Sequence, residues 1–261
     1  MKGRIKMKKL LETFYTFKKQ VIFTIIGGIL IGAIPSGLPI HAHAISLDQD
    51  SEVENVFEHF EQILNSTIEI DMKDVPTLEN AFSKDFNNNT FVIHSDQAAL
   101  NLQDKTILED EQGYFHLVVP IVSDDYNMLS NFTVMYDENY SLIGYAETLF
   151  FESENGYFKV SNFLNGNFVG ETETDIVFIE NEEFETQLYE FEELVTNPRA
   201  RGAISCTAAV LGIGVVLAGL LVAACLSVCI ATVGTGCAIC MGGFVTIGGV
   251  AYAAVLRCWG L

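Results

Sequence analysis

The chain has 261 residues, enough for one or two compact domains in addition to targeting segments. Its formal net charge of -20 at pH 7 argues against nucleic acid as a partner, because phosphate backbones attract basic proteins. The charge is segregated: residues 1–44 hold seven Lys or Arg and one acid, residues 45–198 hold four Lys and 33 acids, and residues 199–261 hold three Arg and no acid. This pattern predicts three segments with different surroundings.

Residues 1–44 have the features of an export signal. Basic residues precede an apolar run from Val21 to Ile34, and Pro35 ends any helix there. The triplet Ala42-His43-Ala44 matches the small-x-small pattern that signal peptidase accepts, so we expect cleavage after Ala44 and secretion of the remainder. The alternative is an uncleaved membrane anchor, because the apolar stretch reaches spanning length when it is extended to Ile40.

Residues 45–198 predict an acidic, soluble α+β domain. A capping box at Ser51-Glu52-Val53-Glu54 begins an expected amphipathic helix, and a second helix is expected after Pro76. A third, acidic helix is predicted over Glu182–Val195. The apolar positions expected to face the core in these helices are Val53, Val56, Phe57, Phe60, Ile63, Leu64, Leu78, Ala81, Phe82, Phe86, Phe184, Leu188, Phe191, Leu194 and Val195.

From about Thr90 the apolar residues alternate, beginning with Phe91 and Ile93, which is typical of β-strands. Asn155-Gly156 and Asn165-Gly166 favour hairpins with type I′ turns, in which both central residues have positive φ. We therefore expect an antiparallel meander of four or more strands, with helices packed on one face.

The acidic domain has no nucleophile elbow, no phosphate-binding glycine loop and no cysteine, so we expect neither enzyme activity nor a cofactor. His59, His94 and His116 are scattered, and structural roles are expected for them. The run after Asp48 imitates a calcium loop, but Val53 occupies the glycine position and His59 stands where the closing Glu belongs. Metal binding is not expected there.

The segment from Gly202 to Leu261 is almost uniformly apolar. It contains one charged side chain, Arg257, no proline and 11 of the 21 glycines. Two runs, Ala203–Val233 and Cys237–Trp259, are separated by Gly234-Thr235-Gly236, which predicts an all-α hydrophobic helical hairpin. Each run has the length to cross about 30 Å of hydrocarbon, so a membrane-tethered extracellular binding domain is the alternative function.

All six cysteines lie in this C-terminal segment, and an even number in an exported chain predicts disulfides. Residues of antiparallel helices lie level when the sum of their numbers is constant. Three nested bridges come close to this condition, with sums of 466, 465 and 464: Cys229–Cys237, Cys225–Cys240 and Cys206–Cys258. A four-thiolate zinc site is the competing use of the two central pairs, whose spacing fits such a site.

A short linker, residues 199–202, joins the acidic domain to the C-terminal unit at residues 203–261. It follows Pro198 and contains Arg199 and Arg201, which together form a plausible protease site. We therefore expect maturation by cleavage after Arg201, carried out by an unidentified protease.

An export signal, a long acidic domain and a terminal unit rich in cysteine and glycine together resemble the halocin C8-like bacteriocin precursors. The resemblance rests on Cys206, Cys225, Cys229, the Cys237-Ala238-Ile239-Cys240 motif and Cys258, and it covers about 60 residues well. It implies that the C-terminal part is a released antimicrobial peptide and that the preceding part is a propeptide or immunity protein. The chain has only six cysteines, so the bridge pattern of the archaeal member is not carried over.

The expected function is therefore that of a secreted, disulfide-stabilised bacteriocin that permeabilises the lipid membrane of target cells. Tyr252, Arg257 and Trp259 are expected at the membrane interface while the apolar arms enter. The acidic domain is expected to keep the peptide harmless by covering it, with its apolar surfaces rather than its charge.

Overall fold

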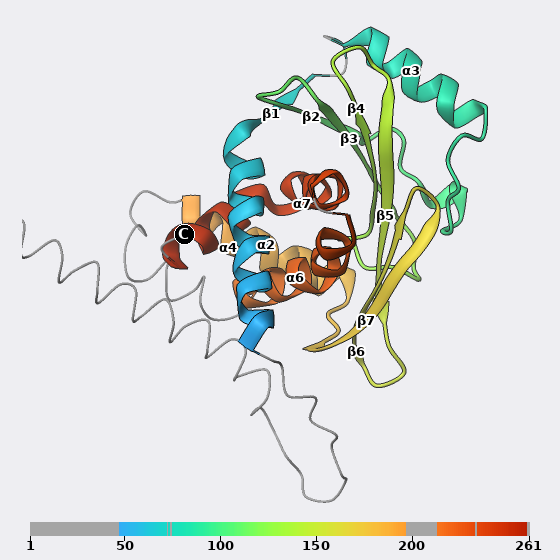
Figure 1. The fold of residues 1–261 in the computed structure, drawn as a ribbon. Coiled ribbons are helices and arrows are strands. Elements are labelled where there is room, and N and C mark those ends of the chain that lie inside the picture. Colours follow the sequence, from blue (N-terminus) through green and yellow to red (C-terminus); the bar gives the residue numbers. More distant parts are fainter. Residues whose placement is uncertain (1–46, 72, 74, 197–212, 233, 260–261) are drawn as a thin grey trace, which may run out of the picture.

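The computed structural model describes residues 47–71, 73, 75–196, 213–232 and 234–259. Its centre is an antiparallel sheet of seven strands in sequence order, a simple meander (Figure 1). The strands are β1 (Thr67–Ile70), β2 (Thr106–Asp110), β3 (Phe115–Pro120), β4 (Asn131–Tyr136), β5 (Leu142–Glu152), β6 (Tyr157–Leu164) and β7 (Asn167–Val177). The predicted α+β meander is confirmed.

Helices lie on both faces of this sheet, whereas the sequence led us to expect them on one (Figure 1). The helix α3 and a short 3-10 turn, η2, accompany the outer face, and the other helices lie on the inner side. The helices are α2 (Leu47–Ser66), α3 (Pro76–Asn87), η2 (Gln97–Ala99), α4 (Asn181–Thr196), α6 (Ile213–Thr232) and α7 (Thr235–Trp259). The inner layer contains α2 and α4 together with the C-terminal helices α6 and α7.

The outer core follows from the alternation of side chains along the strands. In β4, Phe132, Val134 and Tyr136 point outward and are fully buried beneath α3, which contributes Leu78 and Phe82. All buried residues of the outer core belong to the acidic domain.

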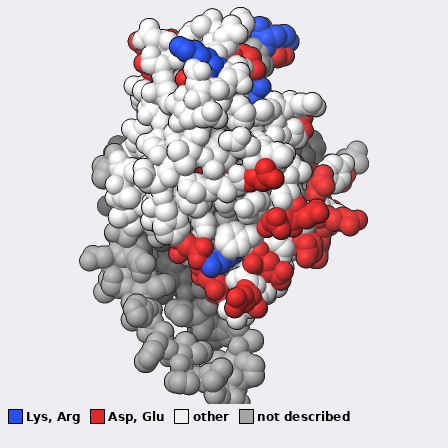
Figure 2. Space-filling model, turned by 90° about the vertical axis from the view of Figure 1, so that its right-hand side faces the viewer, with Lys and Arg blue, Asp and Glu red and all other residues white. Residues whose placement is uncertain are grey.

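On the outer surface of the sheet, charged side chains are few in the middle, and acidic side chains gather on the lower part (Figure 2).

The inner core is shared between the acidic domain and the C-terminal helices. Phe150 of β5 meets Phe244 of α7 edge to face, with ring centroids 5.7 Å apart. The predicted stripes of α2 and α4 close the same cluster from the other side, through Phe60 and Phe184 among others. The domain boundary predicted at 198 lies outside the described residues, but the parts on either side of it form one hydrophobic core.

One of the two predicted type I′ turns is confirmed. Asn165 has a φ of 50° and Gly166 one of 76°, as such a turn requires between β6 and β7. At the other site only Gly156 has positive φ, and β5 and β6 are joined by four residues, Ser153–Gly156. The Ser153 hydroxyl lies within hydrogen-bond distance of the Asn155 and Tyr157 amides, which favours this wider turn.

Two boundaries differ from the prediction. The helix α2 begins at Leu47, four residues before the expected cap at Ser51, and Asp48 and Asp50 suit the first turn because acids offset the helix dipole. The segment from Thr90 to Ile93 is a loop rather than a strand. The alternation of apolar residues in this segment comes from packing and not from strand pairing, because Phe91 is inserted into the outer core between Phe82 and Phe132.

Replacement of Phe244 by Ala tests the shared inner core. Phe244 is fully buried, so its loss should lower the free energy of unfolding by about 3–5 kcal/mol. Urea unfolding of the full chain, followed by circular dichroism, should show one transition at a lower midpoint. The control Ile230→Ala, at a side chain 53% exposed on α6, should change stability by about 0.5 kcal/mol or less. Separate unfolding of the C-terminal helices in the parent chain would contradict a shared core.

Candidate functional site: the disulfide-bonded helix pair and the surface that holds it

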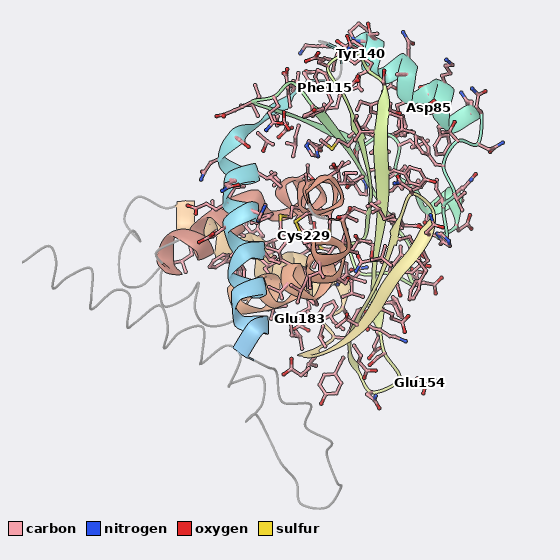
Figure 3. All side chains as sticks on the ribbon, viewed as in Figure 1. Asp85, Phe115, Tyr140, Glu154, Glu183 and Cys229 are labelled. Atoms are coloured by element: carbon pink, nitrogen blue, oxygen red, sulfur yellow. A yellow bond between two sulfur atoms is a disulfide. The ribbon has the colours of Figure 1, made fainter. Side chains whose placement is uncertain are left out.

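The helices α6 and α7, called here the helix pair, are joined by a tight reversal. Gly234 has a φ of 117°, a conformation that side chains other than glycine rarely adopt, and it lies where the sequence predicted the break. Two disulfides hold the arms together beside this turn, Cys225–Cys240 and Cys229–Cys237 (Figure 3 labels Cys229). Their Cα atoms are 5.7 Å and 4.2 Å apart, respectively.

These are two of the three nested bridges predicted from the sequence. They occupy all four thiols of the alternative zinc site, so that alternative is wrong for this structure. Cys206 and the side chain of Cys258 lie outside what the structure describes, and the third bridge stays a prediction. Within the described part of the chain, no group of three or more metal-ligating side chains occurs.

The helix pair is enclosed by the acidic domain on two sides. The helix α7 lies against β3, β4 and β5 and is covered by α2 and α4, while α6 lies against β6 and β7 (Figure 1). The fully buried side chains that the pair contributes include Leu217, Leu220, Leu221, Met241 and Phe244. From Ile213 to Leu256 the sequence of the pair has no charged residue, so this stretch contributes no ion pair to the contact with the acidic domain.

The sequence predicted that both C-terminal arms have the length and apolarity to cross a bilayer. Across the residues that the structure describes, no helix meets both conditions.

The inner face of the sheet is not purely apolar beneath the helix pair. Five polar side chains, each at most 2% exposed, cross it from β3 to β6: His116, Asn131, Thr133, Thr148 and Asn162. We call this set the polar strip. Burying polar groups is unfavourable unless they are hydrogen-bonded. The hydrogen-bond partners of the strip therefore show whether it depends on the helix pair.

Most hydrogen bonds of the polar strip stay within the acidic domain. Thr133 donates its hydroxyl to Asn131 Oδ1 at 2.9 Å, and Asn131 Nδ2 donates to the Leu129 carbonyl at 3.0 Å. Thr148 donates to Asn162 Oδ1 at 3.1 Å. One bond crosses to the helix pair: Asn162 Nδ2 donates to the Ala224 carbonyl, in the middle of α6, at 2.8 Å.

His116 forms the end of the polar strip. Its Nε2 lies 3.9 Å from Asp110 Oδ2, and its Nδ1 has no hydrogen-bond partner among the described residues. Burial acts to raise the pKa of Asp110, but His116 and the backbone amides of Tyr114 and Gln112 outweigh it, and the pKa lies below its usual 3.8. The carboxylate of Asp110 is therefore stabilised in the folded chain.

The buried carboxylate of Glu147 has a structural role on the outer face. It accepts hydrogen bonds from the backbone amides of His94 and Ser95, each at 2.8 Å, and His94 Nδ1 lies 3.2 Å away. The imidazole of His94 also stacks on Phe163. These contacts fix the loop after α3 against β5 and do not assemble a nucleophile with a base.

The structure places only some of the residues singled out from the sequence. Ala44, Arg201 and Cys206 lie outside the described residues. Tyr252, Arg257 and Trp259 belong to α7, but their side chains are not among those described. Sequence reasoning missed the polar strip, whose only signal is polar residues at alternate positions of otherwise apolar strands, as at Asn131 and Thr133 of β4.

Paired substitutions test the bridge pattern. In the full chain purified without reductant, Cys225→Ser with Cys240→Ser removes one whole bridge, so thiol titration in denaturant should find no new free thiol. The control, Cys225→Ser with Cys237→Ser, removes half of each bridge and should expose two thiols. The reverse result would contradict the pairing.

Asp110 gives a pH prediction with a definite sign. Because its folded pKa is lowered, its contribution to stability is present above the usual carboxyl pKa and is lost as pH falls through the folded value. The stability advantage of the parent chain over Asp110→Asn should therefore shrink between pH 7 and pH 3 in urea unfolding. Burial raises the pKa of Asp175. The stability of the parent chain relative to Asp175→Asn should therefore increase as pH falls, opposite to the change for Asp110→Asn. Equal pH dependence of the two differences would contradict these assignments.

Compared with models of protein families, with curated proteins and with solved structures, the chain gives no match.

Proposed function

We propose that the chain is the precursor of a secreted antimicrobial peptide, the segment from about Gly202 to Leu261. In this proposal the acidic domain, residues 45–198, is its propeptide or immunity protein. The observation that carries the proposal is the burial of the apolar helix pair against the inner face of that domain. A segment held in this way is kept out of water and away from lipid until it is released.

The apolar surface of the helix pair gives the driving force for membrane binding. Moving such surface out of water gains roughly 25 cal/mol per Å². Charge contributes little, because Arg257 is the only charged side chain from Gly202 onward. The partner is therefore the hydrocarbon of a target-cell membrane, with Tyr252, Arg257 and Trp259 proposed at the interface.

The two disulfides explain how the helix pair survives release. Both close short loops beside the turn, with sequence separations of 15 and 8 residues. Short apolar segments rarely stay folded in water by themselves, and a disulfide typically contributes about 2–4 kcal/mol by restricting the unfolded chain. The bridges keep the arms together when the sheet is no longer present.

The acidic domain supplies the charge that the helix pair lacks. Its 33 acids over residues 45–198 give the precursor a strongly charged exterior, and net charge of this size favours solubility. Its apolar contact surface, from Phe60, Phe150 and Phe184 among others, covers the pair. The same surface would allow the domain to rebind the released peptide, and an immunity protein of this kind would protect the producer cell by such binding.

Release is tested by following the chain in culture. Mass spectrometry of the supernatant should find an oxidised fragment of about 60 residues that begins near Gly202. Arg199→Ala with Arg201→Ala should abolish this fragment and leave the secreted precursor, whose N-terminus should be Ile45. A control change at Lys159, which lies on β6, should leave release unaffected.

The released fragment should then leak dye from lipid vesicles and inhibit related cells, whereas the intact precursor should be about tenfold less active or weaker, because membrane binding scales with the apolar area that is free to bind. A reduced and alkylated fragment should lose most of this activity. A purified, oxidised fragment that neither leaks vesicles nor inhibits growth would contradict the proposal.

A further inference from the structure

We propose that the polar strip is the specificity determinant by which the acidic domain recognises this particular helix pair, through two glycines of α7 and one carbonyl of α6. The inference rests on the proposed function, in which the acidic domain covers the peptide and rebinds it. It goes further by naming the residues that distinguish this peptide from any other apolar hairpin.

The two faces of β4 bury different kinds of side chain. The outer face of β4 buries Phe132, Val134 and Tyr136, and the one polar atom among these side chains, the Tyr136 hydroxyl, donates to Asp85. On the inner face, the same strand presents Asn131 and Thr133 to α7. Because these two groups bond to one another and to the Leu129 carbonyl, they remain satisfied when the helix pair is absent. The inner face is therefore suited to a partner that leaves.

The glycines of α7 allow the backbone to lie directly on the polar strip. A Cβ atom at position 243 would overlap Asn131 Oδ1 and would lie 2.9 Å from Thr133 Oγ1. A Cβ at position 242 would lie 2.8 Å from His116 Nδ1. Two hydrogen bonds fix the amide of Asn131, so it cannot turn aside without losing them. A side chain at position 243 would therefore force Asn131 to break these bonds or α7 to move away from the strip.

Asn162 adds an attractive contact to this steric selection. Its Nδ2 donates to the Ala224 carbonyl, while its Oδ1 accepts from Thr148, so the orientation of the amide is fixed. Its neighbour across the sheet, Gly170, lies beside Ser227 of α6. Apolar contacts accept many partners, whereas a fixed donor and a steric limit reject those that differ.

The test uses the full chain with a specific protease site placed in the linker, residues 199–202, cut after folding and without reduction. Gel filtration and dilution then measure how tightly the C-terminal fragment stays with the acidic domain. Gly243→Ala should weaken this association about tenfold or more, although alanine favours a helix over glycine. Asn131→Ala in the same chain makes room for the methyl group and should restore much of the loss, a coupling that independent sites do not show.

A second variant, on the acidic domain, does not depend on the folding of Gly243→Ala. Asn162→Asp keeps an acceptor for Thr148 but places a carboxylate oxygen against the Ala224 carbonyl, so association should weaken about tenfold or more. The matched control, Asn88→Asp, adds the same charge at an exposed position after α3 and should have no effect.

The outcomes separate the two proposals. If the cut parent chain holds its fragment and the variants Gly243→Ala and Asn162→Asp hold it equally well, recognition by the polar strip is wrong and the covering role stands. Weakening by Gly243→Ala that Asn131→Ala does not relieve would also overturn the strip. If the cut parent chain releases its fragment at once, the covering role fails and the recognition proposal fails with it.

Discussion

The packing of the apolar helix pair on the inner face of the sheet is the contact on which the rest of the structure depends. Without it, Phe150, Phe158 and Val160 on the inner face would meet water, and so would the buried leucines of α6. The helices α2 and α4 close over the same cluster and complete a layer around the pair. The long sheet therefore serves as a platform, and its outer face has an independent core beneath α3.

This contact combines two kinds of interaction with different consequences. Apolar burial provides most of the free energy but distinguishes poorly between one hydrophobic hairpin and another. The polar strip adds little net energy, because its groups exchange one set of hydrogen bonds for another. Its value lies in geometry: a Cβ atom at position 243 would overlap Asn131 Oδ1, and Asn162 donates to the Ala224 carbonyl.

The buried titratable groups of the acidic domain form hydrogen bonds that hold its local structure. Glu147 is saturated by backbone amides, and Asp110 accepts from the amides of its own turn. Burial raises the pKa of Tyr136, with a further contribution from Asp85, so its phenol stays protonated and donates to that carboxylate at 3.1 Å. Each of these groups stabilises the local structure around it.

The sequence by itself determined the features that depend on neighbours along the chain. Helical spacing identified the stripes of α2, α3 and α4, the Asn165-Gly166 turn followed from its φ requirement, and the level positions of cysteines in an antiparallel pair gave two disulfides. Only the tertiary structure decided what depends on distant contacts. The loop at Phe91 has the alternating apolar pattern of a strand because Phe91 packs into the outer core. The segment β1 is a strand because it pairs with β2. The centre of the polar strip exists because the register of three strands places Asn131, Thr148 and Asn162 side by side, which local pattern does not encode.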